Sequence, residues 1–190
     1  GILVADVSGH GTPAAVLMAI THSLAHTQPG VHCPPAVMLT RLNEQLARHY
    51  TSRTTTFVTA FYGIFDPRTL RLTYALAGHP PPRLKRCADG SVAILSGTAG
   101  LPLGVVENEQ YHDATHELQR GDQIVFYTDG ITEAFGPGHE MFGTERLDRV
   151  LEDCSVNATS LMDAVLRAVA EFTNDRPPDD DRTCLIAKVT

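Results

Sequence analysis

Three short acidic motifs, far apart in the chain, carry the residue types best suited to chemistry. Each lies where an apolar, strand-like run meets a turn or a polar segment. Strand ends that converged would place these carboxylates in an all-oxygen cage of the kind that Mg²⁺ or Mn²⁺ prefers. The spacing therefore predicts a divalent metal site assembled from distant segments. The motifs are Asp6-Val7-Ser8-Gly9-His10-Gly11, Tyr127-Thr128-Asp129-Gly130 and Asp179-Asp180-Asp181-Arg182-Thr183.

Two divalent ions held by carboxylates can activate a water and clamp a phosphoryl group during in-line displacement. Such a site needs no nucleophilic side chain. The sequence has no Gly-x-Ser-x-Gly elbow and no phosphate-binding glycine-rich loop ending in lysine. Asp-Gly pairs are also common in plain surface turns, so composition alone leaves the metal site and the turn open as explanations.

The bulk composition indicates one soluble globular domain over residues 1–190. Hydrophobic residues make up 43% of the chain and charged residues 19%, as is usual for such a domain. The net charge of −7, with no basic stripe, argues against nucleic acid as a partner. The longest apolar run, residues 14–20, is too short for a membrane span, so no membrane contact is expected. Four cysteines without paired spacing indicate free thiols and a cytoplasmic location.

Helices are expected on both sides of a strand-rich middle. Thr12-Pro13 reads as an N-cap followed by proline at the first helical position, and a second helix is expected to begin near Pro34-Pro35. Further along, Thr144 can cap a short helix, which a longer helix follows. Apolar residues at helical spacing mark the core faces of these helices: Leu17, Ile20, Leu24, Met38, Leu42, Leu46, Leu147, Leu151, Leu161, Val165, Val169 and Phe172.

The middle of the chain reads as β-strands. Residues 57–65 are β-branched and aromatic, and the turn at residues 66–69 joins them to an alternating run over residues 70–76, which predicts a hairpin. Further strands are expected on either side of turns at residues 88–90 and 120–122. The order of elements predicts an α+β domain, an antiparallel β-sandwich flanked by helices in α-β-β-α layers. The shorter strands are expected over residues 82–86, 91–95, 111–118, 123–127 and 183–189.

In their order and spacing, the motifs resemble the protein phosphatase 2C-like, metal-dependent Ser/Thr phosphatases. The resemblance is to the bacterial branch typified by the stage II sporulation phosphatase and the stress-sigma-factor regulators, and it extends over essentially the whole chain. Any one motif is weak, whereas their order and spacing together are highly specific. The segments that carry the resemblance are Asp6-Val7-Ser8-Gly9-His10-Gly11, residues 57–65, Ala77-Gly78-His79-Pro80-Pro81, Leu101-Pro102-Leu103-Gly104, Gly121-Asp122, residues 127–133, Phe142-Gly143 and Asp180-Asp181-Arg182-Thr183.

The resemblance implies a central β-sandwich with a two-metal site at one end. By this resemblance Asp6 bridges two Mg²⁺ or Mn²⁺ ions, and the backbone carbonyl of Val7 is a further ligand. Asp129 and Asp180 complete the second metal site. The expected catalytic carboxylates are therefore Asp6, Asp129 and Asp180.

Two points about this ligand set are open. Asp181 replaces Asp180 if the register slips by one residue, and Asp179 is expected to be a solvated neighbour. The family also carries a ligand Asp in an upstream Gly-Gly-Asp motif, which a chain beginning at Gly1 is expected to lack together with its strand. One metal site would then be impaired and the fragment could be inactive. A domain swap, a partner strand or a homodimer could cover the open sheet edge.

Three residues near the motifs have two readings each. His10 could donate a proton to the leaving serine oxygen, or only help to pack the turn into the first helix. His79 could be catalytic, or stabilise its own turn. Glu133 could face the metals from the helical turn that begins at Asp129, or it could be an exposed acid near a helix start, favoured by the helix dipole.

Four polar residues are expected to play smaller roles. Ser8 is expected to be a turn residue, and Thr128 is expected to contact the metal ligands without binding the metal itself. Asn43 and Glu44 could belong to regulatory helices next to the active site, or be ordinary surface residues.

The resemblance implies a protein phosphatase that removes phosphate from phosphoserine or phosphothreonine with a metal-activated water. Its expected substrate is a phosphorylated anti-sigma-factor antagonist, and it would be the output domain of a bacterial signalling protein. A non-catalytic module that binds its partner through the same surface is the alternative, motivated by the missing upstream Asp. A two-metal hydrolase of nucleic acid or of a small phosphoester is a third possibility, and the acidic charge speaks against nucleic acid.

Overall fold

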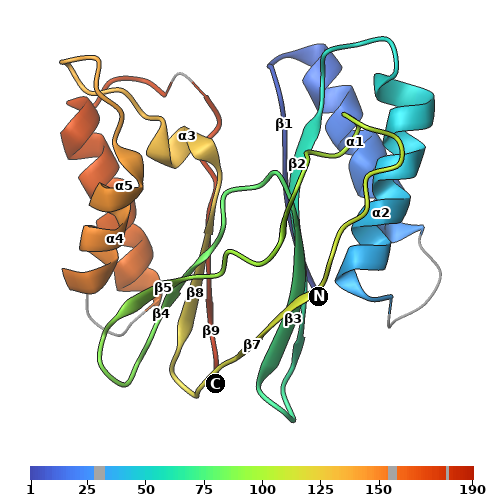
Figure 1. Ribbon diagram of the computed structural model, residues 1–190. Helices are drawn as coiled ribbons and strands as arrows, with labels where there is room; N and C mark the ends of the chain where they lie inside the picture. The colour runs from blue at the N-terminus through green and yellow to red at the C-terminus, as the bar shows by residue number, and fades with distance from the viewer. Residues whose placement is uncertain (28–32, 154–157, 179) are drawn as a thin grey trace. The chain divides into compact units, whose positions relative to one another are not determined.

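A computed structural model describes residues 1–27, 33–153, 158–178 and 180–190. The chain forms two compact units, one of Gly1–His79 with Ser96–Glu117 and the other of Pro80–Leu95 with Leu118–Thr190. Each unit consists of one sheet and the helices that pack on it (Figure 1). The expected fold class, α+β with two antiparallel sheets flanked by helices, is confirmed.

The sheet of the first unit has the strand order β1-β2-β3-β6, and β7 also pairs with β3. The β2–β3 pair is the hairpin predicted from residues 57–76, and the Asp66 carboxylate closes its turn by accepting the Arg68 N–H and the Thr69 hydroxyl. All pairs are antiparallel except the short β3–β6 pair. The strands are β1 (Ile2–Val7), β2 (Val58–Asp66), β3 (Arg71–Ala77), β6 (Ala99–Gly100) and β7 (Ala114–Glu117).

Helices α1 (Thr12–His26) and α2 (Pro35–Leu46) cover one face of this sheet, and α2 continues into the single π-helical turn η1 (Ala47–Thr51) (Figure 1). Their apolar faces form a core with the sheet, as their helical spacing predicted. The expected cap of α1 was wrong by one residue, because Gly11 and not Thr12 is the N-cap. Gly11 has φ 79°, a conformation that a residue with a side chain rarely adopts.

The second unit has a four-stranded antiparallel sheet of order β5-β4-β8-β9. The strands are β4 (Arg83–Lys85), β5 (Val92–Ile94), β8 (Gln123–Tyr127) and β9 (Cys184–Lys188). Helices α4 (Gly143–Asp153) and α5 (Ala158–Thr173) pack on one face, and the single turn α3 (Asp129–Thr132) follows β8 directly. Because α4 begins at Gly143, the expected cap Thr144 lies inside its first turn.

The strands expected on either side of residues 120–122 are present as β7 and β8, but they belong to different sheets. β7 pairs with β3 in the first unit, whereas β8 pairs with β4 and β9 in the second. The buried Asp122 carboxylate explains the separation, since it accepts the backbone N–H groups of Gln119 and Cys87 and an Arg86 guanidinium bond. Its backbone carbonyl also accepts the Val189 N–H, so the turn is tied to the β4–β5 hairpin and to β9.

Two buried cations of β4 hold helix α4 to the second sheet. The Arg83 guanidinium lies 2.6 Å from Asp148 Oδ1, and the Lys85 ammonium donates to the Leu151 carbonyl near the end of α4. A cation is favourable at that end because the last helical carbonyls have no partners within the helix.

No helix in the described part of the chain combines the length and the apolar composition of a membrane span.

Candidate active site

Thr128 joins the segment of Asp129 to the segment of Asp180 in the second unit. Its backbone N–H donates to the Thr183 carbonyl at 3.2 Å, and its hydroxyl oxygen accepts the Thr183 N–H at 3.0 Å. The same hydroxyl donates to the Asp181 carbonyl at 3.2 Å. Two of the three acidic motifs therefore lie side by side. Thr128, which was expected to support the metal ligands, holds the two motifs together.

Asp129 begins α3 and is partly buried. Its backbone carbonyl accepts the Glu133 N–H at 2.6 Å, which fixes the start of the helical turn. Its Oδ1 atom is buried and has no hydrogen-bond partner among the residues that the structure describes. A buried carboxylate oxygen without a donor is costly unless a cation pairs with it. This oxygen is thus suited to bind a metal ion.

A hollow of about 100 Å³ is lined by Gly130, the residue after Asp129, and by residues of the Asp180 motif. Asp180 contributes an exposed carboxylate, whose Oδ1 accepts the Asp181 N–H at 2.8 Å. Glu133 and Arg182 also line the hollow. None of these three side chains makes an ion pair with another described residue. Asp179, the third acid of the run, lies outside the described residues.

The position of Glu133 corrects one of its two readings. Helix α3 has only four residues and ends at Thr132, so Glu133 is its C-cap and not an acid near a helix start. The helix dipole does not favour an anion at that end. The side chain instead lines the hollow together with Asp180, which leaves the metal-facing role as a prediction.

Gly130 allows the two segments to approach each other. A Cβ atom at this position would collide with the Asp181 carbonyl oxygen and would lie 3.5 Å from Arg182 Cγ. The glycine of the Thr-Asp-Gly motif is therefore required by the close packing of backbone against backbone.

In the first unit, Asp6 lies near the end of β1 and is paired in register with Thr59. Its strand neighbours Ala5 and Val7 belong to the core under α1 and α2. Because successive side chains of a strand point to opposite faces, Asp6 lies on the face of the sheet away from these helices. A metal ligand here would thus be outside the helix-covered core.

The Val7 carbonyl also has a favourable position for a ligand. Both backbone polar groups of Val58, its partner in register, are bonded to Leu103 at 3.0 and 2.8 Å. Val7 and Val58 therefore form a non-hydrogen-bonded pair, in which the Val7 carbonyl points away from β2. Ser8, one residue on, accepts the Phe57 N–H at 2.9 Å with its hydroxyl and donates its own N–H to the Phe57 carbonyl, as a turn residue should.

His79 is buried, with 5% of its surface exposed, and its Nδ1 lies 3.0 Å from the Thr59 hydroxyl. Thr59 is directly opposite Asp6, and directly opposite residues of an antiparallel pair share a face. His79 thus lies next to the strand pair that carries Asp6, which the sequence did not indicate. Its contact with Thr59 agrees with a supporting role, and catalysis by His79 remains an untested prediction.

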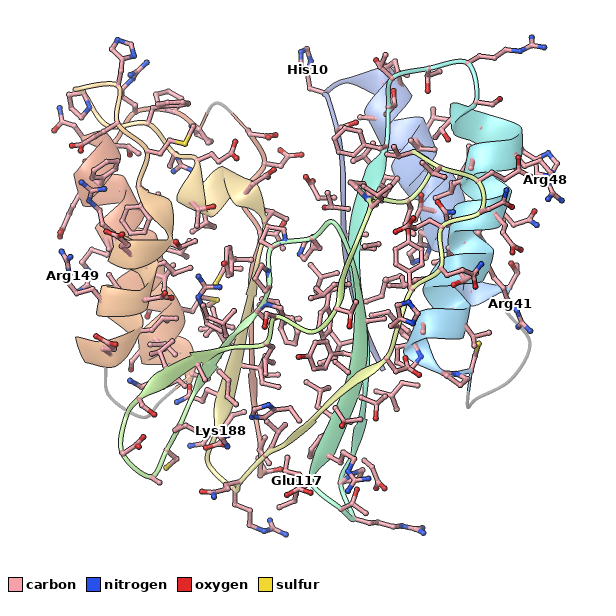
Figure 2. All side chains as sticks on the ribbon, viewed as in Figure 1. His10, Arg41, Arg48, Glu117, Arg149 and Lys188 are labelled. Carbon is pink, nitrogen blue, oxygen red and sulfur yellow. The ribbon has the colours of Figure 1, made fainter. Side chains whose placement is uncertain are left out.

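His10 lies in the loop after β1 and points away from the sheet (Figure 2). Its side chain is exposed and forms no hydrogen bond with a described residue. The expectation that it packs the turn into α1 is therefore wrong, and its role as a proton donor stays a prediction.

Asn43 is completely buried, so the reading of this residue as surface polar was wrong. Its amide donates to the carbonyls of Val106 and Glu107 and accepts the Gly104 N–H. Leu103, at the start of the same loop, is the residue that bonds to Val58. Helix α2 thereby holds the loop that follows Leu103, and Leu103 in turn bonds to the partner of Val7. In the sequence, only the Leu-Pro-Leu-Gly motif marked this loop.

All the expected ligands offer oxygen atoms, as Mg²⁺ and Mn²⁺ require. Asp6 and Val7 belong to the first unit, and Asp129 and Asp180 belong to the second. Among the described residues, no three His, Cys, Asp or Glu side chains are grouped closely enough to hold an ion. The individual donors fit a metal, and the complete ligand set remains a prediction.

Comparison with known proteins places the chain in one family. The sequence profile of the family described as stage II sporulation protein E (SpoIIE) matches residues 1–190. The chain therefore belongs to the SpoIIE family of protein phosphatase 2C-type serine phosphatases. This membership confirms the resemblance drawn from the motifs.

Two relatives from Bacillus subtilis (strain 168) are named phosphoserine phosphatases. The chain is 32% identical to RsbU over 132 residues, covering 70% of this chain and 38% of RsbU. It is 28% identical to RsbP over 142 residues, covering 70% of this chain and 33% of RsbP. The chain thus spans about a third of the length of these relatives.

Solved structures share the fold. The SiaA-PP2C domain of Pseudomonas aeruginosa superposes with a TM-score of 0.80 at 25% identity, covering 98% of this chain and 74% of that one. The SpoIIE phosphatase domain of Bacillus subtilis, solved with a fragment of its regulatory domain, gives a TM-score of 0.73 at 16% identity. That alignment covers 98% of this chain and 54% of the other, and at this identity it shows the fold alone.

Proposed function

We propose that this protein is an Mg²⁺- or Mn²⁺-dependent phosphatase of phosphoserine and phosphothreonine in proteins. The observation that carries the proposal is the buried Oδ1 of Asp129 in the Thr-Asp-Gly motif, which has no hydrogen-bond partner in the described part of the chain. Thr128 holds this carboxylate beside the segment of Asp180, which supports a shared role for the two acids. Membership of a serine phosphatase family supplies the reaction class.

The proposed ligands are the carboxylates of Asp6, Asp129 and Asp180 and the backbone carbonyl of Val7, which together hold two ions. Asp180 is preferred over Asp181 because Asp180 lines the same hollow as Gly130, the residue after Asp129. When bound, the ions supply an activated water and positive charge on the phosphoryl oxygens.

The chain's own residues would prepare the site for this chemistry. Asp129 and Asp180 would be preorganised by the hydroxyl of Thr128, so that little reorganisation is needed during the reaction. Gly130 would keep the two segments close enough for their carboxylates to act together. No side chain has to act as a nucleophile in this scheme.

For the substrate we propose a phosphorylated anti-sigma-factor antagonist, with the protein acting in cytoplasmic signalling. The support is the naming of RsbU and RsbP as phosphoserine phosphatases. A solved structure titled as the RsbU and RsbW domains of Rv1364c from Mycobacterium tuberculosis shares this fold, with a TM-score of 0.72 at 24% identity. The dependence on a metal has a parallel in RsbX, of the same fold, which was solved in complex with magnesium.

Phosphate release by the full-length protein tests the proposal. A phosphoserine-containing protein substrate should be dephosphorylated in Mn²⁺, and excess EDTA should stop the reaction until Mn²⁺ is restored. Retention of full activity in EDTA would contradict metal dependence. If the protein binds the phosphoprotein in Mn²⁺ but does not dephosphorylate it, the result would support a non-catalytic binding module instead of an enzyme.

A further inference from the structure

We propose that the Arg182 guanidinium binds the phosphoryl group of the substrate and so contributes to its specificity. This inference rests on the proposed phosphatase function and adds a residue to it. Arg182 belongs to the motif Asp180-Asp181-Arg182-Thr183. The proposed metal site uses an acid of this motif and does not use its arginine.

The backbone of Arg182 is held on both sides by Thr128. The preceding carbonyl, of Asp181, accepts the Thr128 hydroxyl, and the following N–H, of Thr183, donates to the same oxygen. Residue 182 is therefore fixed relative to Asp129, which is the next residue after Thr128. An exposed arginine on a free loop would have no such constraint.

The Arg182 side chain follows the start of α3 into the hollow. Its Cγ lies 3.5 Å from the position that a Cβ atom of residue 130 would occupy, so the aliphatic stem runs beside the bare backbone of Gly130. The side chain then lines the hollow with Asp180 and Glu133. The stem is thus partly buried, which reduces the number of positions that the guanidinium can take.

The charged side chains of the hollow form no ion pair with a described residue. The ion pairs of the second unit join Arg83 to Asp148, Arg86 to Asp122 and Arg146 to Glu140, and none of them includes Arg182. A guanidinium without an ion-pair partner among the described residues, in a hollow shared with two carboxylates that can hold cations, suits a ligand with phosphoryl oxygens.

A phosphate monoester has the chemistry that this arrangement needs. Its oxygens can accept two parallel N–H bonds from the planar guanidinium, while ions on the carboxylates bind the same group. The hollow of about 100 Å³ has room for a phosphoryl group but not for a folded segment of the substrate protein. The inferred contact is therefore with the phosphate and not with the sequence around it.

Titration of inorganic phosphate into the Mg²⁺-loaded protein tests the inference without any turnover. Arg182→Ala and Arg182→Gln should each weaken phosphate binding about tenfold, since a charge-assisted contact is lost. Arg182→Gln keeps most of the stem beside Gly130 and decides the matter if the alanine variant does not fold. Arg176→Ala is the matched control, because this exposed arginine lies six residues upstream and does not line the hollow.

A parallel titration with Mn²⁺ separates phosphate binding from a structural role. Loss of a nearby positive charge should leave Mn²⁺ affinity equal or slightly tighter in the Arg182 variants, whereas a structural defect would weaken both ligands. Equal phosphate affinity in wild type and both variants overturns the inference. If wild type hydrolyses no phosphoserine substrate, the proposed function fails, and the phosphate titration still decides the role of Arg182.

Discussion

Thr128 and Thr183 are joined by two hydrogen bonds that run in opposite directions, at 3.2 and 3.0 Å. They continue the β8–β9 pairing one step past Tyr127 and Cys184, at the point where the chain turns into α3. One of the two bonds uses the Thr128 hydroxyl, which also donates to the Asp181 carbonyl. A single hydroxyl therefore links the two acidic segments of the second unit.

Replacement of Thr128 by valine should loosen this link. The loss leaves the Thr183 N–H and the Asp181 carbonyl without their partner, so we expect a loss of about 1–3 kcal/mol in the free energy of unfolding, measured by urea denaturation. Phosphatase activity should fall about tenfold or more. Thr128→Ser keeps the hydroxyl and should stay close to wild type. Equal behaviour of the valine and serine variants would show that the hydroxyl is unimportant.

A methyl group at Gly130 should separate the two segments. Gly130→Ala brings a Cβ atom against the Asp181 carbonyl oxygen, and backbone atoms on both sides must move to relieve the collision. We expect a destabilisation of about 1–3 kcal/mol and at least a tenfold loss of Mn²⁺ affinity. Gly138→Ala is the control, because no heavy atom lies within 4 Å of its added Cβ. Unchanged Mn²⁺ binding in Gly130→Ala would refute this account of the glycine.

Asn43 should matter for stability more than Gln45, a partly exposed polar residue of the same helix. Asn43→Leu removes three hydrogen bonds to the backbone of residues 104–107 and leaves these part-buried groups without the partner that they have in the wild type. We expect a loss of about 2–4 kcal/mol in the free energy of unfolding. Gln45→Ala, in the same helix, should cost about 0.5 kcal/mol or less. A loss of similar size in both variants would contradict a special role for the hydrogen bonds between Asn43 and residues 104–107.

The thiol of Cys184 should make the stability of the fold depend on pH in the alkaline range. Burial raises the pKa of its thiol from 9.0 to about 11. The unfolded chain then releases this proton first, so the contribution to stability is complete below pH 9 and is lost as the pH rises toward 11. Cys184→Ala should lose less stability than wild type between these pH values in urea titrations. Cys87→Ala, at an exposed thiol, should follow wild type; identical slopes in all three proteins would be the contrary result.

Local patterns in the sequence were sufficient for most elements. The β-branched and aromatic composition of residues 57–65 and the alternation over residues 70–76 predicted the β2–β3 hairpin. The spacing of Leu161, Val165 and Val169 likewise predicted the buried face of α5. Such patterns report which face of an element is buried, and they do not report its partner. For this reason the sequence predicted the two strands beside residues 120–122, but gave no sign that β7 and β8 belong to different sheets.

For the candidate active site, the sequence predicted the acidic residues but not the contacts that position them. Asp129 and Asp180 could be expected near each other because each lies at the end of an apolar strand, and β8 and β9 do pair. The contacts of Asn43, Thr128 and Arg182 depend on loops from distant parts of the chain, for which periodicity carries no signal. Asn43 was the clearest case, since a polar residue in a helix gives no indication that it is buried and bonded to a loop about 60 residues away in the chain.

The most direct test of the central claim is Mn²⁺-dependent phosphate release by Asp129→Asn in the full-length protein. Asparagine keeps the shape of the side chain but removes the negative charge that a metal ligand needs. We expect turnover to fall at least about 100-fold, equivalent to about 2.7 kcal/mol, while Asp163→Asn, an exposed position in α5, retains wild-type activity. Wild-type turnover by Asp129→Asn in saturating Mn²⁺ would show that this carboxylate is not a catalytic ligand.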